Sequence, residues 1–221
     1  MTFRELRGAD ISKHEIDWRV KIGYLIREYP GVYRVGHTAH SVEARYMAAV
    51  KACGEGAVLA GMAAGYVYGL LPKCKTPPPP EVWTRTERNI DGIRTRRARR
   101  MDPRETRRWR GIPIASVPRT LVDLSSVLPF DELARACHEA GVRYRTTPRQ
   151  VAEVLGRRPN APGSRNLRRV MHGEVRVTLS KLEDRFIEEL TAARLPLPVT
   201  NRVATAAAST AAGQSSGSRS S

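Results

Sequence analysis

The sequence predicts an α+β protein in which short helices and short strands alternate along most of the 221 residues. Segments of the form Ser/Thr-x-x-Glu/Gln, which are typical of helix starts, recur along the chain. Runs rich in Val, Ile and Thr lie between turns that contain Gly or Pro and favour strands. After residue 203 the chain has no Asp, Glu or Lys and is mostly Ala, Ser, Thr and Gly. A disordered tail is therefore expected over 204–221.

The first residues predict two consecutive helices. Thr2-Phe3-Arg4-Glu5 and Ser12-Lys13-His14-Glu15 both have the capping-box form, in which a hydroxyl and a carboxylate satisfy amides of the first turn. The first box predicts a short helix to about Leu6. The second predicts a helix that begins at Ser12 and ends at Gly23.

A β-hairpin is expected directly after the second helix. Residues 24–28 and 32–35 predict two strands that are joined around Pro30-Gly31. A helix, a turn, a second helix and a hairpin in this order predict a winged helix-turn-helix over 1–37.

The segment "ISKHEIDWRV" followed by "GYLIREYPGVYRVGH" resembles the N-terminal domain of AbiEi-type antitoxins of type IV toxin–antitoxin systems, common in actinobacteria. The resemblance runs from Ser12 to His37 and implies that the helix from Ser12 enters the major groove of double-stranded DNA. In that family a further helix comes first, so the domain is expected to lack its first helix through a misassigned start codon. Glu15 and Asp17 depart from the family's more basic pattern. The alternative to DNA contact is that the cationic side chains only form a solvent-exposed face of the helix that begins at Ser12. The DNA contacts that the resemblance implies are Lys13, His14, Trp18, Arg19, Lys21, Arg27 and Arg34.

Residues 38–173 predict a second domain that combines helices with a small antiparallel sheet. "YMAAVKACGEGAVLAGMAAGYVYGLL" and "IPIASVPRTLVDLS" resemble the same antitoxin family, and the second segment implies a strand that leads into a helix. Asp123 in that segment is expected to cap or brace structure. The helices are predicted over 41–52, 61–70, 131–140, 148–155 and 164–171, and the strands over 81–86, 93–98 and 110–115.

The chain is strongly basic, with 38 Lys+Arg against 22 Asp+Glu and a formal net charge of +16. Such a charge favours polyanions and indicates nucleic acid as a partner. Between Arg85 and Arg119 twelve arginines face four acids, a balance of +8. These arginines either contact phosphates or only solvate an exposed face of the sheet, and a GC-rich genome is a further source of arginine. The secondary phosphate contacts predicted here are Arg94, Arg96, Arg97, Arg99 and Arg100.

Cys53, Cys74 and Cys137 are odd in number and widely spaced, which indicates reduced thiols and a cytoplasmic protein. The first residues do not have the basic-then-apolar pattern of a secretory leader, and no apolar run is long enough to span a bilayer. We therefore expect no leader and no membrane partner. His14 and the His37-x-x-His40 pair are interpreted as ordinary polar residues, and no metal or other cofactor is expected.

Residues 174–203 resemble the beginning of a very-short-patch-repair-like endonuclease domain of the PD-(D/E)xK class, up to Val203. Such nucleases need two acidic strands that hold Mg²⁺, and neither follows. A truncation or frameshift after Val203 is the interpretation. Glu183 is accordingly expected to cap a helix together with Ser180 rather than to bind metal.

Three functions follow from these observations. The leading prediction is a non-catalytic DNA-binding protein, either antitoxin-like or a transcriptional regulator, with a nucleotidyltransferase toxin system as a further partner. The alternative is a DNA endonuclease whose catalytic core has been lost. The third is a role in protein interaction alone within a toxin–antitoxin pair. The DNA target and the oligomeric state stay open.

Overall fold

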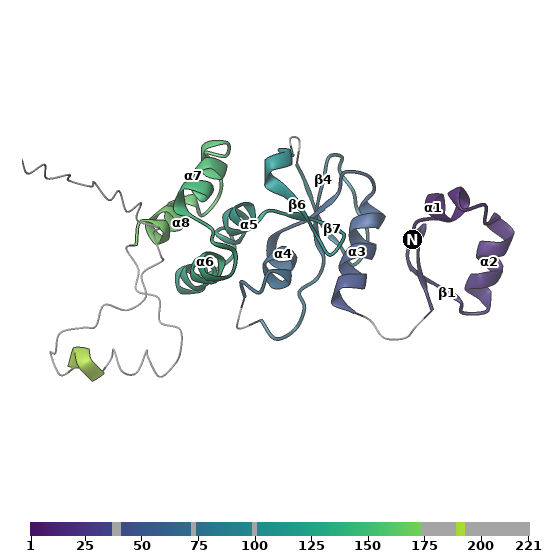
Figure 1. Cartoon of the computed structure of the whole chain (residues 1–221), viewed down its shortest axis with the longest axis horizontal. Helices are drawn as coiled ribbons and strands as arrows, with labels where there is room; N and C mark the ends of the chain where they lie inside the picture. The colour runs from purple at the N-terminus through teal and green to yellow at the C-terminus, as the bar shows by residue number, and fades with distance from the viewer. Residues whose placement is uncertain (37–40, 72–73, 99–100, 174–188, 193–221) are drawn as a thin grey trace, which may run out of the picture.

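The computed structural model describes residues 1–36, 41–71, 74–98, 101–173 and 189–192. It has a mixed α/β architecture with one two-stranded and one five-stranded sheet, arranged as Figure 1 shows. No helix in these ranges combines the length and the apolar character that crossing a bilayer would need.

The N-terminal unit consists of α1 (Phe3–Gly8), α2 (Lys13–Lys21) and a hairpin of β1 (Leu25–Tyr29) and β2 (Val32–Val35). The predicted helices and hairpin are thus confirmed. The capping box that begins at Thr2 is complete. The box at Ser12 is only half formed, because the Ser12 hydroxyl accepts from the Glu15 amide at 3.1 Å while the Glu15 carboxylate pairs with Arg19 at 2.5 Å.

This unit encloses a small hydrophobic cluster of its own. Leu6 of α1, Ile16 of α2, Leu25 of β1 and Tyr33 of β2 are all buried and in contact. The chain before α1 also runs along β2, since Thr2 forms an antiparallel bridge with Val32. Both helices are therefore fixed against the hairpin.

The five-stranded sheet is formed by β3 (Val58–Leu59), β4 (Glu81–Thr84), β5 (Arg94–Arg97), β6 (Thr106–Trp109) and β7 (Ile112–Ala115). Its strand order is β5-β4-β3-β7-β6. β4–β5 and β3–β7 are parallel, whereas β3–β4 and β6–β7 are antiparallel. The prediction of an antiparallel sheet was therefore wrong. Strands this short carry too little alternation to reveal their order, which long-range pairing decides.

Two of these strands, β3 and β6, were not predicted. β3 has only two residues, and β6 contains two arginines that hide its strand pattern. The strand expected from Arg110 begins later, at Ile112, because Arg110 and Gly111 have φ of +46° and +82° and form the turn between β6 and β7.

Helix α3 (Val42–Cys53) packs on one side of the sheet, and α4 (Gly61–Val67) and α5 (Val117–Leu124) lie on the other (Figure 1). The helix predicted over 61–70 ends three residues early, before Gly69, which has a φ of +67°. Around α5 pack α6 (Phe130–Tyr144), α7 (Pro148–Gly156) and α8 (Ser164–Met171). The predicted starts of α7 and α8 are confirmed, while α6 continues past Ala140 to Tyr144.

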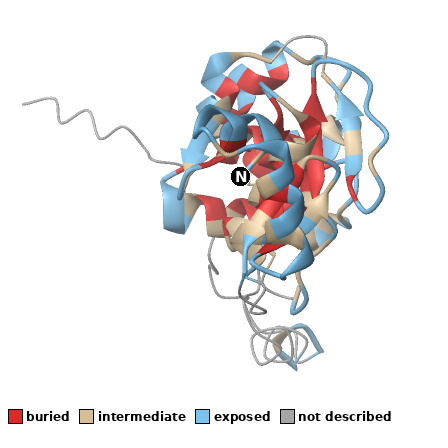
Figure 2. Ribbon diagram, turned by 90° about the vertical axis from the view of Figure 1, so that its right-hand side faces the viewer, coloured by how far each residue is buried: buried red, intermediate tan, exposed pale blue. Residues whose placement is uncertain are grey.

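The main core joins the sheet to these helices. Leu59, Val82 and Ile114 of the sheet are fully buried, as are Tyr46 of α3 and Leu121 of α5. Figure 2 shows the buried residues gathered inside, while the outward faces of the helices are exposed. The N-terminal unit meets this body at α3, where Lys51 pairs with Glu5 at 2.7 Å.

Candidate nucleic-acid interface

The side of α2 that points away from the hairpin carries five exposed residues, which we call the α2 outer face: Lys13, His14, Asp17, Trp18 and Lys21. At about 100° per residue these positions fall within an arc of about 140°. Trp18 is 54% exposed, although it is the largest side chain of the helix. The face has two cations and one anion, so its balance is positive.

Arg19 lies outside this face. Its guanidinium pairs with Glu15 one turn earlier and stands over the ring of Tyr24, 5.8 Å from the centroid. A contact between Arg19 and DNA would have to replace an i,i+4 ion pair, which is worth only about 0.3–0.5 kcal/mol.

The hairpin presents its two predicted cations differently. Arg27 is exposed and donates to the Tyr33 hydroxyl at 3.5 Å, which raises the pKa of Arg27 further and keeps it cationic. Arg34 instead pairs with Glu28 at 2.7 Å, and both side chains are less than one fifth exposed. Of the two arginines, Arg27 is therefore the more exposed to solvent.

Apolar side chains also lie exposed at this end of the molecule, which the sequence analysis did not anticipate. Ile22, Tyr24 and Val35 are each about half exposed, at 54%, 53% and 48%. Ile22 and Tyr24 lie between α2 and β1, and Val35 is the last residue of β2. Trp18 and Ile22 are four residues apart and share one side of the helix end.

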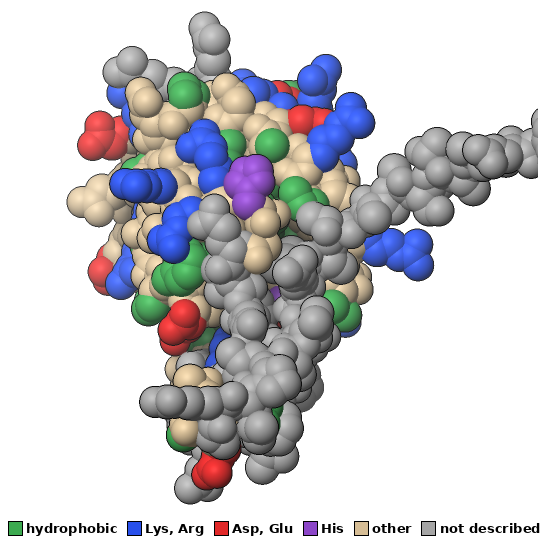
Figure 3. All heavy atoms as spheres, turned by 90° about the vertical axis from the view of Figure 1, so that its left-hand side faces the viewer, with side chains coloured by type: hydrophobic (Ala, Val, Ile, Leu, Met, Phe, Trp, Pro, Cys, Tyr) green, Lys and Arg blue, Asp and Glu red, His purple; other side chains and the backbone are tan. Residues whose placement is uncertain are grey.

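The predicted secondary contacts on β5 are partly exposed and partly engaged. Arg94 and Arg97 are exposed on this edge strand, whereas Arg96 pairs with Glu81 at 2.7 Å. Arg99 and Arg100 lie outside the described residues. Lys and Arg side chains also occur, interspersed with acidic ones, on the opposite end of the molecule (Figure 3). Positive charge is therefore not confined to the N-terminal unit.

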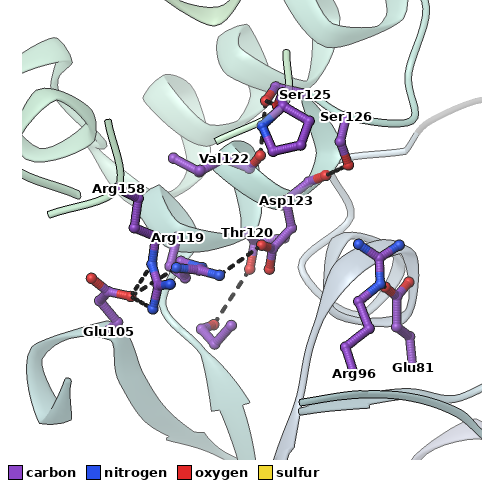
Figure 4. Close-up of polar contacts among 12 residues, drawn as sticks. Glu81, Arg96, Glu105, Arg119, Thr120, Val122, Asp123, Ser125, Ser126 and Arg158 are labelled. Carbon is purple, nitrogen blue, oxygen red and sulfur yellow. Dashed lines mark hydrogen bonds and ion pairs between the residues drawn. The ribbon is translucent and has the colours of Figure 1, made fainter. Parts of the chain in front are cut away.

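A buried ionic cluster lies between the sheet and α5, and sequence reasoning did not find it. The carboxylate of Glu105, 3% exposed at the end of a 3₁₀ turn (Pro103–Glu105), accepts from Arg119 at 3.1 Å, Arg157 at 2.8 Å and Arg158 at 3.0 Å. Arg119 also lies over Trp83, with its guanidinium carbon 3.6 Å from the ring centroid. Figure 4 shows most of these groups converging from separate elements.

Asp123 completes the cluster. It pairs with Arg119 one turn earlier at 3.1 Å, which confirms the expectation that it braces structure. Burial and the neighbouring Glu81 carboxylate raise the pKa of Asp123 well above its ordinary value, while the Gly61 amide and Arg96 offset part of that rise. The Arg-x-x-x-Asp spacing of this pair is visible in the sequence and is the one local signal of the cluster.

The remaining predictions concern the cysteines, the histidines and the C-terminal segment. Cys53, Cys74 and Cys137 are all unpaired, and burial raises the pKa of Cys53 to about 11. His37, His40, Ser180, Glu183 and the tail over 204–221 lie outside the described residues. Within the described ranges no three His, Cys, Asp or Glu side chains form a group that could hold a metal ion.

No family model matches the chain, and no curated protein matches it either.

Proposed function

We propose that the protein binds double-stranded DNA as a non-catalytic, antitoxin-like or transcriptional regulator. In this proposal α2 lies in the major groove and the β1–β2 hairpin rests beside the phosphate backbone, with Arg27 on a phosphate. The observation that carries the proposal is the α2 outer face, which keeps polar, cationic and aromatic side chains exposed on one capped helix.

The spacing of that face suits the dimensions of DNA. Lys13 and Lys21 are eight residues apart, which is about 12 Å along a helix axis and close to the width of the major groove. Lysines at both ends of the face are placed to contact phosphates on the two sides of the groove. His14 and Trp18 lie between them, where side chains reach base edges.

The whole chain supports the same partner through its charge. A net charge of +16 attracts a polyanion, and binding releases the counterions condensed on DNA. We expect the affinity for DNA to fall steeply as the salt concentration rises. Each phosphate contact should add about −0.9 to the slope of the logarithm of the association constant against the logarithm of the salt concentration.

The test is fluorescence anisotropy of the full chain with duplexes that carry 5′-hydroxyl ends, over a series of salt concentrations. The double substitution Lys13→Ala/Lys21→Ala should weaken binding and reduce the salt slope by about 2. The matched control is Lys75→Ala/Arg149→Ala, which also removes two cations, both exposed and both distant from α2 in sequence. Equal weakening by the two double variants, or affinity that ignores salt, would refute the proposal.

Sequence preference is tested separately by selection from a pool of random duplexes. The wild-type chain should enrich a shared motif, and Trp18→Ala should lose that enrichment while it keeps most of its salt-dependent affinity. Loss of affinity without any change in the enriched motif would show that Trp18 does not read bases.

A further inference from the structure

Beside the buried ionic cluster lies a pocket of about 420 Å³, bounded by β4, β5, α5 and the turn between α7 and α8. Among its lining residues a single acidic one, Asp123, faces five arginines. We call this site the arginine pocket and define it by those arginines, which are Arg96, Arg97, Arg119, Arg157 and Arg158.

Buried carboxylates fix the arginines at the rim of this pocket. Arg96 donates through Nε to Glu81 at 2.7 Å, and Arg157 donates through Nε to Glu105 at 2.8 Å. The two carboxylate side chains are only 5% and 3% exposed. A guanidinium that is held through Nε still has its terminal N–H groups in a fixed fork, which is the geometry that grips phosphate oxygens in pairs.

The charge of the site favours an anion. The five arginines outweigh Asp123 together with Glu81, Glu105 and Asp102, the acids that pair with them, so at least one positive charge remains. The raised pKa of Asp123 reduces the negative charge that this carboxyl brings to the lining.

Two buried polar atoms on residues that line the pocket lack hydrogen-bond partners. They are Nε of Arg119 and Oδ2 of Asp123. Among the buried side-chain nitrogen and oxygen atoms of the described residues, these are the two without a hydrogen-bond partner. An unpaired buried polar atom is destabilising, and a bound group or an ordered water is what ordinarily supplies its partner. Both residues line the arginine pocket, so a group bound in the pocket would lie beside them.

We propose that the arginine pocket binds a phosphomonoester, supplied either by a free nucleotide or by the 5′-phosphorylated end of a nucleic-acid strand. Several fixed guanidinium groups suit the two negative charges and the tetrahedral oxygens of such a group. The volume lies in the range of small-molecule sites. The site shares no residue with the α2 outer face, so it stands independently of the proposed duplex contact.

The experiment is calorimetric titration of the full chain with five probes: inorganic phosphate, adenosine, adenosine 5′-monophosphate, and a single-stranded oligonucleotide with either a 5′-phosphate or a 5′-hydroxyl. We expect the nucleotide or the 5′-phosphorylated strand to bind at least tenfold more tightly than its partner without phosphate. Equal binding of nucleotide and strand assigns the pocket to the phosphomonoester alone, and preference for the strand assigns it to a nucleic-acid end. Binding that does not distinguish phosphorylated from unphosphorylated probes would overturn the proposal.

Two substitution pairs locate the site without touching the buried carboxylates. Arg97→Ser should weaken phosphate binding about tenfold, the size of one partly hydrated charge-assisted hydrogen bond. Arg94→Ser is the matched control, because Arg94 is exposed on the same strand but does not line the pocket. Asn160→Asp adds a negative charge at the lining and should weaken binding, whereas Asn89→Asp, an exposed site elsewhere, should not.

Equal effects of Arg97→Ser and Arg94→Ser would overturn the proposal, since they would show attraction by overall charge. The Lys13→Ala/Lys21→Ala variant should bind the phosphorylated probes with wild-type affinity. The Arg97→Ser variant should lose no more affinity for 5′-hydroxyl duplexes than the Arg94→Ser variant loses. A failure of the duplex proposal is thereby distinguished from a failure of this one.

Discussion

Replacing Glu105 with Gln is expected to destabilise the fold strongly, because one buried carboxylate compensates three guanidinium groups. Gln keeps the shape and the acceptor oxygen of the side chain but removes its charge. Arg119 then stays at 8% exposure with Asp123 as its remaining partner, while Arg157 and Arg158 lose their closest anion.

The magnitude follows from how far each arginine can return to water. Breaking a fully buried ion pair by removing one partner costs about 3–5 kcal/mol. Arg157 and Arg158 are 33% and 28% exposed and can recover part of their hydration, so we expect the lower end, about 3 kcal/mol. For a protein of this size that corresponds to a fall in Tm of about 6–12 °C.

Urea unfolding followed by tryptophan fluorescence measures this loss, since Trp83 packs directly on Arg119. The matched control is Glu43→Gln, which also removes one carboxylate that pairs with an arginine. Its pair with Arg110 is 39% and 71% exposed, so the expected cost is below about 1 kcal/mol. If Glu105→Gln costs no more than Glu43→Gln, the cluster is not the stabilising element described here.

Two further predictions concern the same region of the fold. The folded-state pKa of Asp123 lies above its ordinary value of 3.8, so the folded state binds more protons, and stability should fall as pH rises from about 4 through the raised pKa. Asp123→Asn should remove that decline, and parallel Tm profiles of the two proteins between about pH 4 and pH 9 would contradict it. Gly163→Ala should cost more than Gly92→Ala although both glycines have a φ of +75°, because a Cβ at 163 would lie 1.8 Å from the Ser125 carbonyl oxygen whereas none lies within 4 Å at 92. The backbone conformation alone accounts for about 1–2 kcal/mol in each, and a thermal melt that gave equal losses would show that the α8 start shifts to make room.

The N-terminal unit could be predicted from the sequence because its signals are local. A hydroxyl at Thr2 or Ser12, a Pro30-Gly31 turn and apolar spacing along α2 act within a few residues of one another. The same holds for the start of α7, where Thr147 and Gln150 form the complete capping box that the sequence predicts.

The sheet and the ionic cluster depended on contacts that no local pattern contains. Glu105 and Arg158 are 53 residues apart, and β3 places its two residues between strands that come later in the chain. The many arginines between Arg85 and Arg119 are typical of a solvent-exposed surface in the sequence. In the fold, however, Arg96 pairs with the buried carboxylate of Glu81. The roles of Glu105 and Glu81 became visible only with the fold.

The two outermost strands of the five-stranded sheet have a consequence for association between copies of the protein. These strands are β5 and β6, and Arg94 and Arg97 on one and Arg107 and Arg108 on the other are exposed. Pairing two such edges would bring rows of guanidinium groups to strand spacing, about 4.8 Å, and their repulsion opposes association between copies. A polyanion that covered these rows would also remove the barrier, so aggregation should be most pronounced near charge neutralisation and should reverse when the polyanion is in excess.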